Sequence, residues 1–208
     1  FIVETREAAR ASGIHLFDVR DPDQGIVHVI SPELAIVLPG ATVVCPDSHT
    51  CTQGAMGAFA WGIGSTEAEH ALATGTLRIA RPRTMRIQFE GRPRAGVTAK
   101  DLSLAVLSRF GSVGGNGYVV EYAGEAIRAL EIEARLTLCN MATEFSAVSG
   151  LIAADDRTFD YLAGRRFAPK GAQWDAALAH WRSLHSDAEA RFDSDLSVDL
   201  ANLGPMIT

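Results

Sequence analysis

Short apolar runs alternate with amphipathic stretches along most of this chain, and turns rich in Gly and Pro separate them. Apolar or alternating runs typical of strands occupy residues 14–19, 25–30, 41–45, 84–90, 118–122, 151–153 and 196–200. Apolar positions have helical spacing over residues 1–12, 65–79, 98–110, 132–148, 156–164 and 174–184. This alternation of strands and helices predicts an α/β fold in which helices flank parallel or mixed sheets.

One break in the pattern divides the chain. The helical spacing that begins at Ser65 runs to about residue 79, and Arg81-Pro82-Arg83 follows, where the proline interrupts regular structure. An alternating strand pattern begins directly afterwards at residue 84. We therefore expect two α/β modules, comprising residues 1–82 and 83–208.

Composition and charge narrow the possible classes of function. The net charge is −6 and no cluster of Lys and Arg stands out, which argues against nucleic acid as a partner because phosphate contacts require a basic surface. No apolar run approaches the roughly 18 residues of a membrane-spanning helix, so we expect no membrane partner. Three cysteines without a pairing pattern are typical of a reducing compartment, and we expect the chain in the cytoplasm.

The densest group of reactive side chains follows the strand predicted over residues 41–45. Asp47, Ser48 and His49 stand in a row there, and side chains at the carboxyl end of such a strand face the crevice that binds ligands. Two interpretations are open: a polar cluster that takes part in chemistry, or a turn whose side chains cap backbone N–H groups. Successive residues of an extended chain point to opposite sides, so Asp47 and His49 can share a face that Ser48 does not.

Three further polar residues stand within apolar segments. His28 is either a histidine satisfied inside the core or a functional imidazole that donates to Asp47. Asn140 and Glu144 are spaced four residues apart in one long predicted helix, so they share one face of it. That face is either a solvated stripe or a pair of polar groups held by partners, because burying such groups unpaired is costly.

The spacing of the glycines does not indicate a phosphate loop, and the spacing of the cysteines and histidines does not identify metal ligands. The glycines between residues 111 and 117 match neither the dinucleotide fingerprint nor the P-loop, so we expect a structural turn there. Cys45, Cys51 and Cys139 form no CxxC pair. Cys45 and Cys51 lie six residues apart across a turn, which leaves a shared metal as an alternative.

The segment that begins at Asp47 resembles the signature of the aconitase superfamily and reads DSHTCTQGAMGAFAWGIGSTEAEHALATGTL. Other segments share this resemblance along the whole chain, among them QGIVHVISPE, LPGATVVCPDSHT, GVTAKDLSLAVL and CNMATE. Within the superfamily, the chain is most similar to the large subunits of isopropylmalate dehydratases. The resemblance implies aconitase-type modules with three layers, α/β/α, in which helices flank each sheet.

The resemblance also implies a cofactor, a reaction and a partner. Members hold a [4Fe–4S] cluster whose free iron acts as a Lewis acid on the hydroxyl of a hydroxy diacid, from which water is removed and added back at the neighbouring carbon. For this chain, the implied reaction interconverts 2- and 3-isopropylmalate in leucine biosynthesis. Two-subunit members have a small swivelling subunit that completes the site, so the resemblance implies a heterodimer.

Matched by motif, the resemblance assigns roles to six residues of this sequence. The catalytic residues that it implies are His28, Asp47, His49 and Glu144. The substrate-binding residues that it implies are Ser48 and Asn140. His28 would pair with Asp47, and Glu144 would lie near the cluster and its bound water, where Asp47 and His49 would also border the substrate.

The chain departs from the family pattern at several positions. Pro46 stands where glycine is usual before DSH, and Gln53 and Tyr118 replace histidines common in isopropylmalate dehydratases. A related dehydratase acting on methylmalate or dimethylmalate is therefore an alternative. The family's cluster cysteines, one alone and then a CxxC pair, have no match in this sequence. We therefore expect an internal piece of a longer subunit, inactive alone, with the cluster ligands outside this chain.

Two alternatives belong to other classes of protein. The first is a clusterless metal-dependent hydrolase that holds a divalent ion with Asp47, His49 and His28. The second is a non-enzymatic scaffold module that keeps the fold for partner binding. A scaffold has no need for polar groups in a crevice, so the retained polar residues argue against it.

Overall fold

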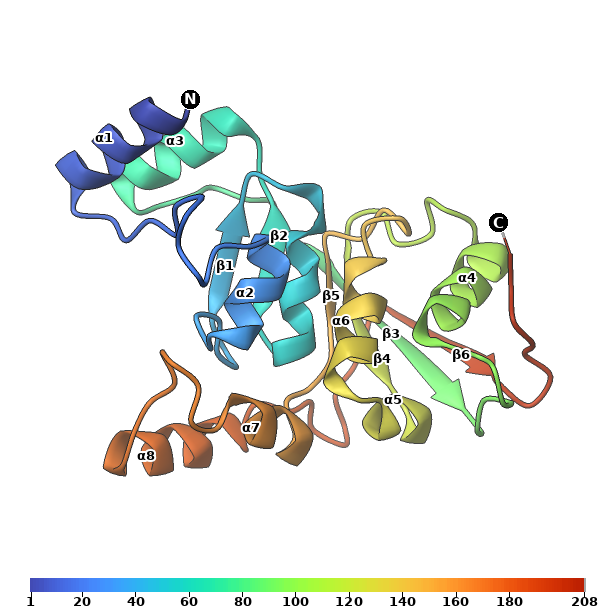
Figure 1. Cartoon of the computed structure of the whole chain (residues 1–208). Helices are drawn as coiled ribbons and strands as arrows, with labels where there is room; N and C mark the ends of the chain where they lie inside the picture. The colour runs from blue at the N-terminus through green and yellow to red at the C-terminus, as the bar shows by residue number, and fades with distance from the viewer. Residues whose placement is uncertain (208) are drawn as a thin grey trace.

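Two parallel sheets organise the chain in a computed structural model that describes residues 1–207; Thr208, the end of the second predicted module, lies outside the described residues. The smaller sheet pairs β1 (Thr42–Cys45) with β2 (Phe59–Gly62). The larger sheet has the order β5-β4-β3-β6 and comprises β3 (Arg83–Glu90), β4 (Tyr118–Ala123), β5 (Ser149–Leu151) and β6 (Ser194–Asp199). Each of these strand pairs is parallel, which confirms the predicted α/β class (Figure 1).

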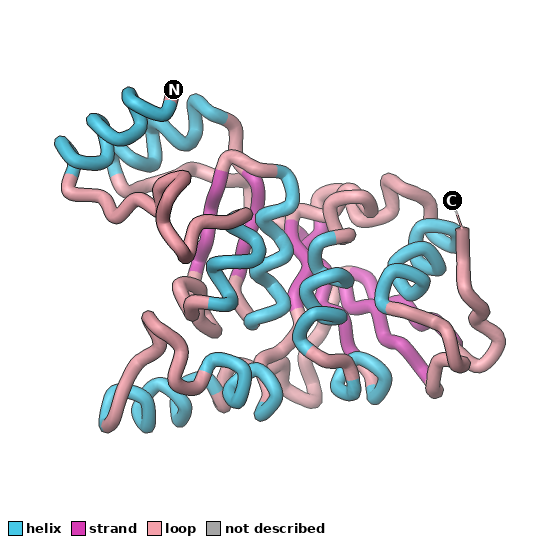
Figure 2. Tube along the Cα trace, in the orientation of Figure 1, coloured by secondary structure: helices cyan, strands magenta, loops and turns pink. Residues whose placement is uncertain are grey.

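Nine helical segments connect and cover these strands within the described residues. They are α1 (Ile2–Ser12), α2 (Val27–Glu33), the 3-10 helix η1 (Ser48–Met56), α3 (Ser65–Thr74), α4 (Ala99–Phe110), α5 (Glu125–Ala129), α6 (Ile132–Asn140), α7 (Asp156–Leu162) and α8 (Ala172–Trp181). Helices α1 and α3 lie at the end of the molecule farthest from the larger sheet, in front of which α4, α5 and α6 lie (Figures 1 and 2). None of the helices among residues 1–207 has both the length and the apolar character needed to cross a lipid bilayer.

Local sequence signals explain where several of these elements begin and end. Helix α1 ends at Gly13, whose φ of 64° suits a residue without a side chain. Helix α4 begins after Thr98, whose backbone N–H and hydroxyl donate to the Asp101 carboxylate at 2.6 and 2.7 Å. In β3, alternate side chains are buried, as the period of a strand facing a core on one side requires.

Three predicted elements are wrong or too long. Residues 14–19 form no strand, and the apolar run 25–30, taken as a strand, instead leads into helix α2. Val27 and Val29 favour a strand by their branched side chains, but in helix α2 both are exposed and His28 is buried. Packing of the helix through His28 thus outweighs the strand preference of the valines. The helix predicted from residue 65 to 79 ends at Thr74, since Gly75 adopts a φ of 67°.

The long helix predicted over residues 132–148 ends at Asn140. Beyond it the chain continues through successive turns in which backbone N–H groups donate three residues back, for example from Glu144 to Met141 and from Phe145 to Ala142. A series of such turns keeps apolar side chains on one side at nearly helical spacing, which is why the sequence pattern continues. Ser146, with a φ of 61°, then turns the chain toward β5. Sequence reasoning also missed η1 and β2, because it assigned no element between the strand predicted to end at residue 45 and the helix predicted to begin at residue 65.

The segment η1 is buried between the two sheets, where it packs against α6, β2 and β5. One cluster of buried apolar side chains continues from η1, with Ala55 and Met56, to Ile87 of β3 and Leu138 of α6. This cluster contains residues from both sides of the predicted boundary between residues 82 and 83. The division into residues 1–82 and 83–208 stays a prediction. Three residues before Leu138 in α6, the Arg135 guanidinium is fully buried and pairs with both oxygens of Asp155, at 2.8 and 2.7 Å.

Among the glycines of residues 1–207, the closest approach to another part of the backbone joins η1 to β5. A Cβ atom added to Gly54 would lie 1.7 Å from the Gly150 carbonyl oxygen, far inside van der Waals contact. The Gly54 carbonyl in turn accepts the Ile152 N–H at 3.1 Å. Glycine at position 54 is thus required for this approach. The approach brings the turn formed by Asp47, Ser48 and His49, called the DSH turn below, beside the segment following α6.

We predict that Gly54→Ala lowers the free energy of unfolding by at least about 1–3 kcal/mol, because the added methyl group forces η1 away from β5. The matched control is Gly204→Ala, where an added Cβ meets no atom within 4 Å and stability should not change. Urea unfolding followed by circular dichroism measures both. Equal midpoints for wild type and Gly54→Ala would show that the approach is not tight.

Candidate functional site

Asp47 begins the polar turn at the carboxyl end of β1. Its backbone is extended, with φ −144° and ψ 134°, and it caps η1 by accepting the His49 N–H on Oδ1 at 2.8 Å. The same Oδ1 lies 2.8 Å from Nε2 of His28. The two interpretations of this turn are therefore compatible, because one carboxylate both caps the helix and binds an imidazole from α2.

These contacts shift the proton affinity of Asp47. The hydrogen bond from His28 and then the one from the His49 N–H hold the pKa of the Asp47 carboxyl below its ordinary value. The carboxylate is half exposed, so its charge also faces the space in front of the turn. His28, by contrast, is buried, and its Nδ1 has no hydrogen-bond partner among the described residues.

His49 links the turn to the segment that follows α6. Its Nδ1 lies 3.1 Å from Ser48 Oγ, and its Nε2 lies 3.3 Å from Glu144 Oε1. A carboxylate only accepts hydrogen bonds, so His49 Nε2–H donates to Glu144, and the tautomer of the ring sets which of Ser48 Oγ and Nδ1 donates to the other. The expectation that Ser48 points away from its neighbours was wrong, because the chain leaves the extended conformation at Ser48 and enters η1.

Asn140 and Glu144 reach the turn by separate routes. Asn140 Nδ2 donates to Thr52 Oγ1 at 2.9 Å, and Thr52 Oγ1 donates to the His49 carbonyl at 2.6 Å. Glu144 contacts the His49 ring itself, from the turns beyond the helix. The predicted common helix face was therefore wrong, yet both residues meet the same turn.

Thr52 is a member of the site that sequence reasoning missed. It connects Asn140 to the backbone of His49, and Cys51 next to it donates its S–H to the Asn140 carbonyl at 3.5 Å. A hydroxyl three residues after His49 is a local signal for such a side-chain to backbone bond, and it could have been used. These contacts anchor α6 to η1 at the site.

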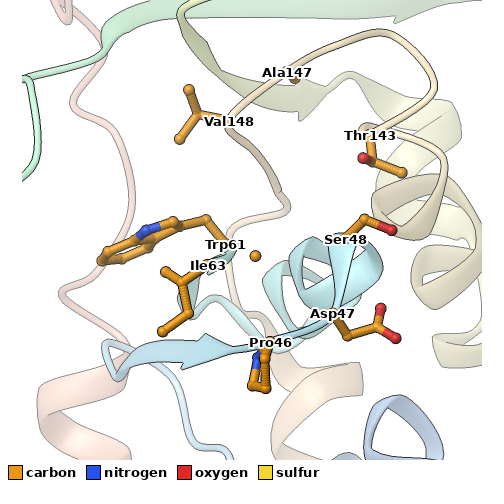
Figure 3. Close-up of a pocket in the computed structure, with 9 residues that line it drawn as sticks. Pro46, Asp47, Ser48, Trp61, Ile63, Thr143, Ala147 and Val148 are labelled. Carbon is orange, nitrogen blue, oxygen red and sulfur yellow. The ribbon is translucent and has the colours of Figure 1, made fainter. Parts of the chain in front are cut away.

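A cavity of about 480 Å³ opens beside this network, at the carboxyl ends of β1 and β2 (Figure 3). The residues that line it are Pro46, Asp47, Ser48, Trp61, Gly62, Ile63, Thr143, Ala147 and Val148. Its size suits a small molecule. Its position also agrees with the rule that ligands of parallel sheets bind beyond the carboxyl ends of the strands.

The cysteines do not form a ligand set for an iron–sulfur cluster. Burial raises the pKa of the Cys51 thiol to about 11, and it raises the pKa of the buried Cys139 thiol as well. Among residues 1–207, no three or more His, Cys, Asp and Glu side chains gather as a metal site. The groups that fit a cluster site are instead the half-exposed polar ones, which could border its bound water and substrate.

Comparison with known proteins gives the family. The aconitase family (aconitate hydratase) matches residues 2–208. This chain belongs to the aconitase family. One relative within that family is the 3-isopropylmalate dehydratase large subunit 1 of Bradyrhizobium diazoefficiens, which is 55% identical over 203 residues.

The match to this relative covers 98% of the chain but 43% of the relative, so the chain spans less than half the length of the aconitase-family protein that it matches. The resemblance found in the sequence is thereby confirmed, both for the family and for the large-subunit type. The geometry adds that four residues expected to be catalytic, His28, Asp47, His49 and Glu144, form one continuous row of contacts. Their roles stay predictions.

We predict that replacing His28 with Leu raises the pKa of the Asp47 carboxyl toward its ordinary value, because the largest interaction that lowers it is lost. In the wild type, the lowered pKa favours the folded state above about pH 3.8, and this contribution disappears as the pH falls through the pKa of the folded state. Carboxyl 13C chemical shifts across a pH titration measure the change. The matched control His15→Leu, whose ring packs on Phe17 instead, should leave Asp47 unchanged.

We also predict that anaerobic treatment of this 208-residue chain with iron and sulfide yields no stoichiometric [4Fe–4S] cluster. Thiolates bind the cluster, and burial keeps Cys51 and Cys139 protonated near neutral pH. Absorbance in the visible range and iron content after gel filtration measure the outcome. A chain that elutes with four irons and four sulfides would contradict it.

Proposed function

We propose that this chain supplies part of the active site of a [4Fe–4S] hydro-lyase that interconverts 2- and 3-isopropylmalate in leucine biosynthesis. The observation that carries the proposal is the row of contacts from His28 through Asp47 and His49 to Glu144, in which Asp47 also lines a cavity of ligand size. The large-subunit relative supports the same assignment, because its name states that it is a 3-isopropylmalate dehydratase.

Dehydration of a hydroxy diacid removes a proton from one carbon and hydroxide from its neighbour, so the site must hold protons at defined atoms. When bound, the cluster's free iron supplies a Lewis acid for the leaving hydroxyl. In this chain, Asp47 orients the His28 imidazole through Nε2, and Glu144 orients the His49 imidazole through Nε2. The two imidazole–carboxylate pairs thus place ring nitrogens at defined positions, as proton transfer to or from a substrate requires.

The charge of the site indicates what else it requires. Asp47 and Glu144 are acidic, whereas the substrate has two carboxylates that need positive partners. We infer that these cations come from other parts of the longer protein or from a small swivelling subunit, the partner that the relative's designation as a large subunit also supports. A cytoplasmic location stays a prediction.

The alternatives differ in their support. A methylmalate or dimethylmalate dehydratase would use the same row of residues and would differ only in the substituent that its substrate carries. The clusterless hydrolase has less support, because the Nε2 of His28 is bound to Asp47 and no three candidate ligands converge within residues 1–207. A scaffold module would not require half-exposed carboxylates and imidazoles bonded in one row.

The test uses the full-length protein that contains this chain, with its cluster and its small partner subunit. Glu144→Gln and His49→Asn should each lower kcat for isopropylmalate dehydration by about 10²–10⁴-fold, because the positioned imidazole no longer exchanges protons correctly. Absorbance of the unsaturated product measures the rate. The control Glu125→Gln, at a surface ion pair with Arg92, should keep full activity.

Wild-type rates in Glu144→Gln and His49→Asn, at an unchanged unfolding midpoint, would remove the basis of the proposal. The same assay with methylmalate and dimethylmalate decides between the dehydratase alternatives. The substrate with the highest kcat/KM identifies the natural class.

A further inference from the structure

The Thr52 hydroxyl lies in the middle of a short chain of hydrogen bonds that joins α6 to the DSH turn. Its oxygen lies 2.6 Å from the His49 carbonyl oxygen and 2.9 Å from Nδ2 of Asn140. Thr52 is buried, with 4% of its surface exposed, so water does not compete for the hydroxyl. Its hydrogen-bond partners are therefore these two groups of the protein.

The chemistry of these three groups sets the direction of each hydrogen bond. A hydroxyl has one hydrogen to donate and a carbonyl oxygen only accepts, so the Thr52 hydrogen goes to the His49 carbonyl. The Thr52 oxygen can then only accept from Asn140, which has to present its NH2 group. The reversed amide would place the Asn140 oxygen against a hydroxyl whose hydrogen is already donated.

This direction leaves the side-chain oxygen of Asn140 available as an acceptor. Within residues 1–207, Oδ1 makes no hydrogen bond, and it is not one of the side-chain atoms that are buried without a partner. Asn140 is only half-buried, so Oδ1 can be reached by a molecule that binds beside the network. The amide therefore uses its donor to hold its own position and keeps its acceptor for a ligand.

The same hydroxyl couples the two partners of the His49–Glu144 contact. On one side it holds the backbone carbonyl of His49, whose ring lies 3.3 Å from Glu144. On the other side it holds Asn140, the last residue of α6, from which successive turns lead to Glu144. The other side-chain bond between η1 and the end of α6, from the Cys51 thiol at 3.5 Å, is weaker because sulfur is a poor donor.

We propose that Thr52 is a positioning residue of the hydro-lyase. Its hydroxyl fixes the Asn140 amide so that Oδ1 accepts from the ligand, and it holds the His49–Glu144 pair in contact. Because Thr52 is buried, it acts through Asn140 and His49 and not by touching the substrate. The kinetic consequence rests on the proposed function, whereas the orientation of the amide does not depend on it.

The kinetic test uses the full-length protein with its cluster and small subunit. Thr52→Val keeps the size of the side chain and removes the hydroxyl, so it should lower kcat for isopropylmalate dehydration by about 10²-fold, because the groups that it held are misplaced. Thr52→Ser restores the hydroxyl and should recover most of the wild-type kcat. The matched control is Thr137→Val, whose hydroxyl donates at 3.0 Å to the Glu133 carbonyl of its own helix and which should behave as wild type.

A double-mutant cycle separates positioning from a general loss of structure. If Thr52 acts through Asn140, the kcat losses of Thr52→Val and Asn140→Ala should not multiply, and the double variant should lose less than their product. Losses that multiply would overturn the inference. So would wild-type kcat in Thr52→Val, or equal losses in Thr52→Val and Thr52→Ser at unchanged unfolding midpoints. Thr52→Ala also lacks the hydroxyl and replaces Thr52→Val if that variant does not fold.

A second measurement needs no turnover, so it separates failure of the inference from failure of the proposed function. A folded wild type that dehydrates no hydroxy diacid contradicts the proposed function. In the full-length protein without its cluster, labelled with 15N-asparagine, the Asn140 side-chain signal is identified by its loss in Asn140→Ala. Its amide protons should exchange with solvent faster in Thr52→Val than in the wild type or in Thr52→Ser. Equal exchange in all three proteins would overturn the inference, whatever the activity.

Discussion

The close approach of η1 to β5 is the constraint on which the site depends. Gly54 meets the Gly150 carbonyl so closely that no side chain fits between them, and this contact brings the smaller sheet against the segment after α6. Without it, Glu144 would not reach the His49 ring, and Asn140 would not reach Thr52. The catalytic arrangement proposed here is therefore a consequence of backbone packing between two parts of the chain whose contacting residues are 88 to 95 positions apart.

Beside this close approach, hydrogen bonds link His28, Asp47, Ser48, His49 and Glu144. Asp47 serves as helix cap and as acceptor for His28, and His49 connects Ser48 to Glu144. Shared partners of this kind fix the orientation of an imidazole, which a single hydrogen bond leaves free to rotate. The cavity begins directly beside this network, at Asp47 and Ser48.

Sequence reasoning worked where the signal is local. The predicted end of the first helix at residue 12, the predicted start of a helix at residue 98 and the alternation over residues 84–90 each depend on a few neighbouring residues. It was wrong where packing overrides local preference, as in the β-branched segment that forms α2. It was also wrong where two structures share one pattern, because successive three-residue turns after Asn140 imitate a helix.

The sequence by itself determined the α/β class, the family resemblance and the six residues of the candidate site. Strand and helix periodicity and a long motif can be recognised because they depend on residues close together in the sequence. Tertiary structure alone decided that His28 packs as part of a helix, that Asn140 meets Thr52 and Glu144 meets His49, and that Trp61 and Val148 line one cavity. Such pairings join residues distant in the chain, and no local pattern specifies which of them meet. They are set when the buried surfaces of the two sheets close around η1.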